Sequence, residues 1–536
     1  MIITGGEIIT KTLERLGVDT LFGIPGIHNL DIYDGLLHSK INHITTRNES
    51  GAGFMADGYA RSTGRPGVAL VITGPGLTNI ITPMGQAMHD GIPMLVISSQ
   101  IPSTVLGQET GFLHELKNST ILAQSVAKES RSVPCIEAIE TYIQEAYHLC
   151  QTGRPGPVHI EIPMDILKET MNSSQTFLEN PHFFSKNTTS NLNHTFIQQA
   201  IDSINDGKQV ALMVGGGAAK AGKQIVRLAE KLHAPIIQTL AGKGIVDERH
   251  SLCLGARLHF QEVRALLMKM DVVIAIGTQL SPTDLWEEPL QLKGKLIQID
   301  LDAGAFNKNY PADLGIKGDA GQIIEKLLPA LEEKNHVHIP DVLADIIVKT
   351  KSRLAEVTGI SNTMELSLNL LEVIRKTLPE DGILFADMTT PAYIGISEYP
   401  CYHEKTYLHP VGFGTLGLAL PAAIGAKLAQ PKKTLCVLTG DGGFQFTMQE
   451  LMVACTQKMT LPIIIWNNNG FGEIRRNEEV RHPGETIAVD HQNPDFIKLA
   501  QAYGITGVRV NSAEEIEKAL QSSLARQKPT IIEINV

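Results

Sequence analysis

Several kinds of residue and segment are scarce in this chain, and each scarcity excludes a class of protein. The six cysteines form no Cys-x-x-Cys pair, so we expect reduced thiols in a cytoplasmic protein rather than a disulfide framework. No apolar run reaches the roughly 18 residues of a membrane span, and the start of the chain lacks the layout of a signal peptide. The net charge of −11 offers no basic surface, so we expect neither a nucleic-acid partner nor a membrane partner.

The length and the order of the apolar segments predict several α/β domains. A chain of 536 residues is too long for one hydrophobic core, and its 43% of hydrophobic residues lies in the globular range. Short apolar runs alternate with helix-like stretches throughout, a pattern typical of parallel sheets covered by helices. We therefore expect an α/β fold of three doubly wound domains with mainly parallel sheets. The expected intervals are domains at 1–167, 195–334 and 362–536, with linkers at 168–194 and 335–361.

The most informative part of the chain is a pair of apolar runs that both end in polar residues. Residues 435–443 end in Gly440-Asp441-Gly442-Gly443, and residues 461–469 end in three asparagines. The spacing between the runs fits a strand–helix–strand crossover, which places Asp441 and Asn468 side by side at the carboxyl edge of a parallel sheet. A carboxylate and an amide oxygen suit Mg²⁺ that also binds a phosphate. The three glycines allow a tight turn and a close approach of backbone N–H groups to phosphate oxygens.

This motif resembles the signature of thiamine-diphosphate enzymes. Further segments match acetolactate synthase and its relatives in the same order along the chain, and they are residues 45–61, 71–79, 90–97 and 412–425. The resemblance runs from about Ile2 to Val536. It implies a pyrimidine-binding domain, a central Rossmann-like domain and a diphosphate-binding domain in the three intervals above, with thiamine diphosphate and Mg²⁺ as cofactors.

The resemblance also implies roles for individual residues. Glu49 stands at the position of the activating glutamate, which generates the C2 carbanion of thiamine, and the apolar residues after it are expected to bury its surroundings. Leu416 would wedge the two cofactor rings together, and the carbonyl of Gly414 would accept the proton of the 4′-amino group. Mg²⁺ would be held by Asp441, Asn468 and the carbonyl of Gly470. The diphosphate would meet Gly440, Gly442, Gly443, Asp387, Thr389 and Thr390, although the last three could equally form a simple helix cap.

Three residues bear on the choice of substrate. His28 and His114 lie where relatives place active-site residues, so each has either a proton-transfer role or a structural one. Glu473 stands where acetolactate synthases carry an apolar residue, and its surroundings look closer to 5-guanidino-2-oxopentanoate decarboxylase. An acid there would suit a cationic substrate tail, or it could form a salt bridge with a neighbouring arginine.

The predicted activity is decarboxylation of a 2-oxo acid through a thiamine carbanion and enamine. Condensation of two pyruvates, as in acetolactate synthase, is the alternative, and a non-catalytic regulatory protein that binds the cofactor is a remote one. Acetolactate synthases hold FAD in the central domain through two segments that this chain replaces at 254–257 and 277–285, so we expect no FAD. In this family the cofactor lies between two subunits, which implies a homodimer or a homotetramer.

Overall fold

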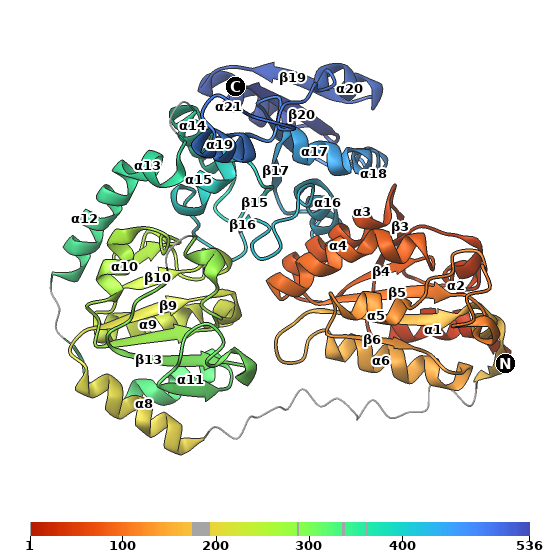
Figure 1. Cartoon of the computed structure of the whole chain (residues 1–536), viewed down its shortest axis with the longest axis horizontal. Coiled ribbons are helices and arrows are strands. Elements are labelled where there is room, and N and C mark those ends of the chain that lie inside the picture. The colour runs from red at the N-terminus through yellow and green to blue at the C-terminus, as the bar shows by residue number, and fades with distance from the viewer. Residues whose placement is uncertain (1, 174–192, 287–288, 335–337, 361–362) are drawn as a thin grey trace.

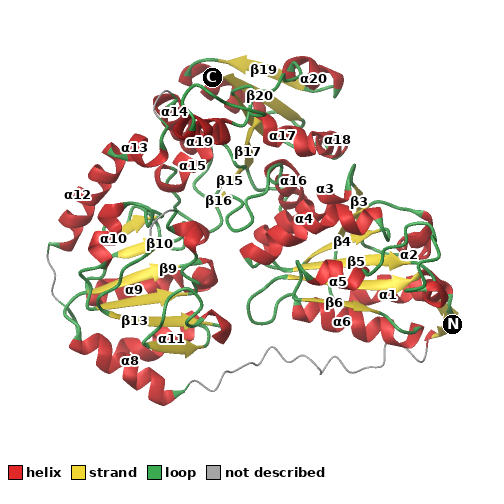
Figure 2. Ribbon diagram, viewed as in Figure 1, coloured by secondary structure: helices red, strands yellow, loops and turns green. Residues whose placement is uncertain are grey.

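Three six-stranded parallel sheets, each flanked by helices, make up the chain (Figures 1 and 2). The computed structural model describes residues 2–173, 193–286, 289–334, 338–360 and 363–536. Every strand pairing within the three large sheets is parallel, so the predicted α/β class with doubly wound parallel sheets is confirmed. Among the helices of these described ranges, none has both the length and the apolar character that crossing a bilayer requires.

The N-terminal sheet has the strand order β3-β2-β4-β5-β7-β6. Its strands are β2 (Thr20–Gly23), β3 (Asn42–Thr45), β4 (Gly67–Val71), β5 (Met94–Gln100), β6 (Glu129–Ser132) and β7 (Pro157–Pro163). Its helices are α1 (Gly5–Arg15), α2 (Leu30–Leu36), α3 (Glu49–Thr63), α4 (Pro75–Asp90), α5 (Ser119–Gln124), α6 (Ile139–Leu149) and α7 (Met164–Lys168). The central strands are buried along their whole length, which is why they read as continuous apolar runs in the sequence.

The central sheet has the order β11-β10-β9-β12-β13-β14. Its strands are β9 (Val210–Val214), β10 (Ile236–Gln238), β11 (Cys253–Gly255), β12 (Val272–Ile276), β13 (Lys295–Asp300) and β14 (Leu314–Lys317). Its helices are α8 (His194–Asp206), α9 (Gly222–Leu232), α10 (Gln261–Leu267) and α11 (Ala320–Leu327). The strand order reverses between β9 and β12, as in a Rossmann-like fold.

The C-terminal sheet has the order β16-β15-β17-β18-β20-β19. Its strands are β15 (Ile383–Ala386), β16 (Tyr407–Leu408), β17 (Leu435–Gly440), β18 (Leu461–Asn467), β19 (Thr506–Val510) and β20 (Pro529–Asn535). Its helices are α14 (Met364–Thr377), α15 (Thr390–Glu398), α16 (Ala419–Ala429), α17 (Asp441–Thr447), α18 (Leu451–Thr456), α19 (Gly472–Arg481), α20 (Phe496–Ala502) and α21 (Ala513–Leu524). The crossover predicted between β17 and β18 is present, but a short 3₁₀ turn divides its helix into α17 and α18.

The two expected linkers differ in what the structure describes of them. Most of 168–194 lies outside the described residues, but its start forms β8 (Thr170–Asn172), which pairs antiparallel with β1 (Ile2–Thr4). The interval 335–361 is largely helical, with α12 (Ile339–Ser352) and α13 (Leu354–Thr358). Apolar residues spaced along one face of α12 pack into the core, which stabilises a helix there. The exact domain boundaries stay a prediction.

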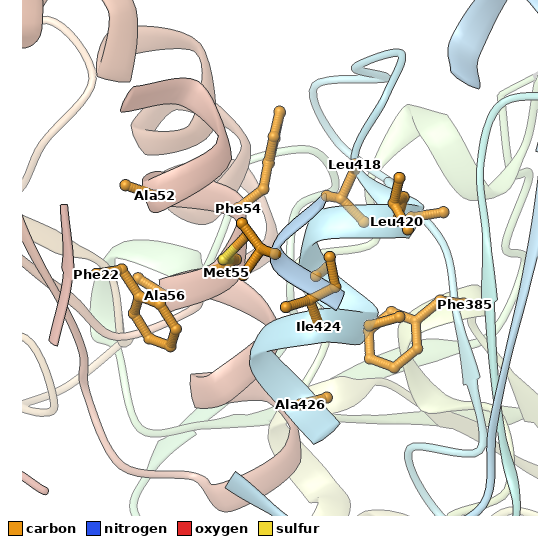
Figure 3. Packing of buried hydrophobic residues seen from close by; sticks show 14 of the residues in the cluster. Phe22, Ala52, Phe54, Met55, Ala56, Phe385, Leu418, Leu420, Ile424 and Ala426 are labelled. Carbon is orange, nitrogen blue, oxygen red and sulfur yellow. The ribbon is translucent and has the colours of Figure 1, made fainter. Parts of the chain in front are cut away.

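The N- and C-terminal domains meet through helices α3 and α16, whose apolar side chains share one core (Figure 3). Two glycines let these helices touch. A Cβ atom on Gly58 would overlap the carbonyl oxygen of Ala422, and one on Gly425 would overlap the carbonyl oxygen of Met55. The close backbone contact therefore fixes how the first and third domains of one chain sit against each other.

The contact at Gly58 can be tested through stability. Alanine favours a helix over glycine, yet we expect Gly58→Ala to lower the free energy of unfolding by about 1–3 kcal/mol, because backbone and not a flexible side chain blocks the new methyl group. Thermal unfolding of the variant would measure the change. An unchanged or raised melting temperature would show that the two helices do not meet here.

Candidate active site

Asp441 and Asn468 follow neighbouring parallel strands, β17 and β18, as the sequence predicted. Asp441 is the first residue of α17 and is only 2% exposed. Its Oδ2 atom accepts hydrogen bonds from Gly470 N at 3.1 Å and from Asn493 Nδ2 at 2.6 Å. Nothing in the sequence pointed to Asn493, which reaches the site from a loop with no recognisable pattern.

Three oxygen atoms converge beside Asp441 without a donor between them. The amide oxygen of Asn468 lies 3.1 Å from Oδ1 of Asp441 and 2.8 Å from the carbonyl oxygen of Gly470. If the Asn468 amide is turned round, its NH₂ group donates hydrogen bonds to the other two oxygens. In the present orientation, a cation between the three oxygens would take the place of these donors. One carboxylate, one amide oxygen and one carbonyl oxygen leave room for waters and phosphate around Mg²⁺. The described residues contain no cluster of three histidine, cysteine or acidic side chains as an alternative metal site.

The glycines of the motif do not form the tight turn that the sequence predicted. Gly442 and Gly443 lie inside α17 rather than in a loop, because the helix begins directly after the strand. A Cβ atom on Gly442 would press against the ring of Phe471, at 2.9 Å. The expected close approach of backbone N–H groups to phosphate oxygens stays a prediction. The N-terminus of α17 also directs its backbone N–H groups toward the sheet edge where a phosphate would lie.

Asp387 accepts hydrogen bonds from residues of its own C-terminal domain. It is buried, and burial raises the pKa of its carboxyl group to about 6, although N–H donors such as that of Met388 oppose the rise. The carboxylate accepts Gly417 N at 2.9 Å and the hydroxyl of Thr439 at 3.3 Å. Thr389 stands at the N-cap of α15, but its side chain makes no capping hydrogen bond, and Thr390 is the first residue of that helix. Contact of these residues with the diphosphate stays a prediction.

The predicted ring-binding residues lie in a turn before α16, which we call the 412–417 turn. Gly414 and Gly417 have φ angles of 65° and 85°, in the left-handed region that favours glycine. Leu416 is half-buried between them. Glycine adopts these angles without strain, so the sequence itself fixes the shape of the turn. The wedge role of Leu416 stays a prediction.

Glu49 opens helix α3 and is only half-buried, although the helical residues that follow it are buried as expected. Its Oε2 atom accepts a hydrogen bond from Asn79 Nδ2 at 2.9 Å. The apolar pocket that we expected around this carboxyl group is therefore incomplete within a single chain. Two backbone N–H···O contacts of 3.1 Å from Arg47 to the buried Glu450 hold the start of α3 against the C-terminal domain.

His28 and His114 come together beside the same turn as Glu49. Their ring centroids are 5.1 Å apart, and within the described part of the chain neither Nδ1 atom has a hydrogen-bond partner. His114 packs on Gly74, and the Glu49 carboxylate lies beside Gly76, so all three candidates surround residues 74–76. Burial, helped by the nearby His114, lowers the pKa of His28, which keeps its ring neutral at neutral pH.

Glu473 forms the salt bridge that was one of its two expected roles. Its carboxylate pairs with Arg476 at 2.5 Å and accepts Asn477 Nδ2 at 2.9 Å, three and four residues along α19. Both charged partners remain about one-third exposed. The carboxylate also faces Tyr393, whose phenol has a pKa raised by burial and by this negative charge.

Within one chain the two groups of candidates lie apart. Glu49 contacts Asn79 near the start of α4, whereas the 412–417 turn contacts Asp90 at its end. A helix rises about 1.5 Å per residue, so roughly 16 Å separate these two contacts along α4.

Glu49 at the start of α3 and the Asp441–Asn468 pair at the edge of the C-terminal sheet are the residues on which the resemblance to thiamine-diphosphate enzymes rests. The comparisons agree. Three models of the thiamine pyrophosphate enzyme family match the chain. They describe the N-terminal TPP binding domain at residues 3–121, the central domain at 197–327 and the C-terminal TPP binding domain at 390–534. The chain belongs to the thiamine pyrophosphate enzyme family.

Similar proteins cover the chain almost end to end. It is 37% identical to the probable 2-ketoarginine decarboxylase AruI of Pseudomonas aeruginosa, over 99% of this chain and 94% of that protein. It is 30% identical to the acetolactate synthase large subunit of Haemophilus influenzae, over 100% of this chain and 94% of that subunit. The expected class, a thiamine-diphosphate-dependent decarboxylase or carboligase like acetolactate synthase, is therefore confirmed.

Proposed function

We propose that the protein decarboxylates 5-guanidino-2-oxopentanoate, also called 2-ketoarginine, with thiamine diphosphate and Mg²⁺. The observation that carries the proposal is the 37% identity, over nearly the whole chain, to a protein named as a probable 2-ketoarginine decarboxylase. Acetolactate formation from pyruvate is the second candidate, because acetolactate synthase subunits match the chain at about 30% identity over the same length.

Each group of site residues has a separate role in this proposal. Bound thiamine diphosphate supplies the electron sink that lets a 2-oxo acid lose CO₂. Asp441, Asn468 and Gly470 hold Mg²⁺ at the phosphate end, and the place of Asp441 and Asn468 after the neighbouring parallel strands β17 and β18 supports this assignment. Glu49 takes up and returns a proton at its carboxylate. His28 or His114, whose Nδ1 atoms have no hydrogen-bond partner among the described residues, relays the proton that replaces CO₂ in the aldehyde product.

Glu473 is the candidate for recognition of the guanidinium group. Arg476 already balances its charge, so a substrate guanidinium would replace Arg476 as the partner of this carboxylate. The partial exposure of both side chains makes such an exchange feasible, because neither charge is buried without water.

The proposed substrate can be tested with two 2-oxo acids. Purified protein with thiamine diphosphate and Mg²⁺ is incubated with 5-guanidino-2-oxopentanoate or with pyruvate, and CO₂, 4-guanidinobutanal and acetolactate are measured. We expect CO₂ and the aldehyde from the first acid at a kcat/KM well above that for pyruvate. Faster acetolactate formation would establish the second candidate instead, and no product from either acid would exclude both.

We expect Glu473→Gln to lower kcat/KM for the guanidino acid at least roughly tenfold, as for a lost charge-assisted hydrogen bond, and to leave that for pyruvate unchanged. Glu479→Gln is the matched control, because Glu479 is a glutamate of the same helix. Its carboxylate accepts a hydrogen bond from Gly484 N at 2.9 Å. Equal losses for both substrates would contradict a role in selecting the substrate tail.

The central domain bears on the FAD prediction. The turn after β9 packs on the segment after β12, and Gly217 N donates to Gly277 O at 3.0 Å. The guanidinium of Arg257, in the other replaced segment, is bound to Leu254 O at 2.9 Å and to Glu398 at 3.0 Å. The Nη atoms of Arg257 and the carbonyl of Gly277 are thus bonded within the protein, and these bonds support a domain without flavin.

We expect the purified protein to be colourless. Its absorption spectrum after gel filtration should lack a flavin band, and denaturation should release no FAD. A band near 450 nm that stays with the protein, together with FAD in the denatured supernatant, would refute this expectation.

A second copy of the chain completes the site in our proposal. Glu49 is only half-buried, and large apolar side chains near the candidates are exposed, among them Leu113 at 60%, Phe413 at 45% and Phe446 at 56%. A partner that covers them would also close the pocket around Glu49. The protein is therefore proposed to act as a homodimer or a homotetramer.

A further inference from the structure

The first half of the 412–417 turn is held by the N-terminal domain of the same chain. Gly412 N donates to Oδ1 of Asp90 at 2.9 Å. Thr415 donates twice to Oε1 of Gln86, from its backbone N at 3.2 Å and from its hydroxyl at 2.9 Å. The second half of the turn is tied to its own domain, because Gly417 N donates to Asp387. The turn is thus clamped from two domains, and Gly414 and Leu416 lie between the clamps.

A buried charge network fixes the orientation of the Gln86 amide. Gln86 is fully buried, and its Nε2 atom donates to Oδ2 of Asp90 at 2.7 Å. The same oxygen accepts Nη2 of Arg61 at 2.6 Å, and Arg61 also pairs with the buried Asp57 at 2.5 Å. An ionised carboxylate only accepts hydrogen bonds, so the NH₂ group of Gln86 must face Asp90. Its oxygen is therefore left for Thr415.

We propose that Gln86, oriented by Asp90 and Arg61, is a positioning residue that sets the place of Gly414 and Leu416 for the reaction. The inference rests on the proposed placement of the cofactor rings at these two residues. Without Oε1 of Gln86, two donors of the mostly buried Thr415 lose their partner, and the turn relaxes between its remaining anchors. The diphosphate end of the site, at Asp441 and Asn468, is untouched by this change.

Binding and activation of the cofactor should therefore respond differently. We expect Gln86→Leu to change the dissociation constant of thiamine diphosphate, measured calorimetrically with Mg²⁺, by less than about threefold. The rate of hydrogen–deuterium exchange at C2 of the bound cofactor should fall roughly ten- to a hundredfold, since small misplacement of reacting groups has effects of this size. Thr415→Val removes one of the bonds and should give a smaller loss, and Thr415→Ser should retain more of the rate than Thr415→Val.

Gln430→Leu is the matched control. Gln430 also joins the two domains, through a hydrogen bond from Nε2 to Ser62 O, but it lies at the far end of α16 from the turn. Its variant should exchange C2 hydrogen at the wild-type rate. If Gln86→Leu fails to fold, as judged by thermal unfolding of the apoprotein, the pair of Thr415 variants decides the question.

The outcomes separate this inference from the proposed substrate. Wild-type exchange rates in Gln86→Leu and Thr415→Val, or an equal loss in Gln430→Leu, would overturn the positioning role. C2 exchange needs no 2-oxo acid, so wild-type protein that exchanges C2 hydrogen but does not decarboxylate the guanidino acid would refute the substrate alone. Wild-type protein that binds no thiamine diphosphate would refute both.

Discussion

Glu49→Gln should reduce turnover at least roughly a hundredfold while the fold and the affinity for thiamine diphosphate stay close to wild type. The side chain is the acid at the start of α3, beside the turn at 74–76 and hydrogen-bonded to Asn79. Glutamine keeps the shape and can still accept from Asn79, but it cannot take up and release a proton. A positioned proton-transfer group contributes about 10²–10⁴-fold to a rate, which sets the size of the expected loss.

Steady-state decarboxylation and calorimetric binding of thiamine diphosphate check this expectation together. The binding measurement is needed because a variant that had lost the cofactor would also be inactive. Turnover within a few-fold of wild type would mean that another group carries the proton. His28 and His114 would then be the next candidates, because they border the same turn.

The parts of the fold that the sequence predicted are those built from continuous local patterns. Strands β17 and β18 are buried along their whole length, so each reads as an unbroken apolar run. The connection rules for parallel strands then bring Asp441 and Asn468 to one sheet edge without knowledge of any other contact. The pairing of Glu473 with Arg476 is local in the same sense, because residues three apart on a helix are neighbours.

The contacts that the sequence could not indicate join distant segments. Gln86 and Thr415 are 329 residues apart, and neither belongs to a motif that names the other. Asn493 reaches Asp441 from an irregular loop, where no periodicity predicts the direction of a side chain. The half-buried state of Glu49 also could not be foreseen, because burial depends on which surfaces meet and not on the apolar residues next to it in the chain.

Activity should return when two inactive variants exchange subunits, which is the second large effect that we expect. In one chain Glu49 contacts α4 at Asn79, whereas the 412–417 turn contacts α4 at Gln86 and Asp90, roughly 10 and 16 Å further along the helix. The proposed dimer with two shared sites would bring the Glu49 of each chain to the Asp441 half of its partner. Glu49→Gln and Asp441→Ala each inactivate both sites of their own homodimer, but they damage opposite halves.

A mixed dimer of these variants has one site with both halves damaged and one site with both halves intact. Equal amounts with random exchange give half of the dimers as mixed, so about a quarter of the wild-type activity should return. The control is Asp441→Ala mixed with the double variant Glu49→Gln/Asp441→Ala, which contains no intact diphosphate half and should stay inactive. Exchange is followed by mass-tagged subunits. If mixed dimers form and no decarboxylation returns, Glu49 and Asp441 do not act together across the interface, because only a site shared between chains can be rebuilt from these two halves.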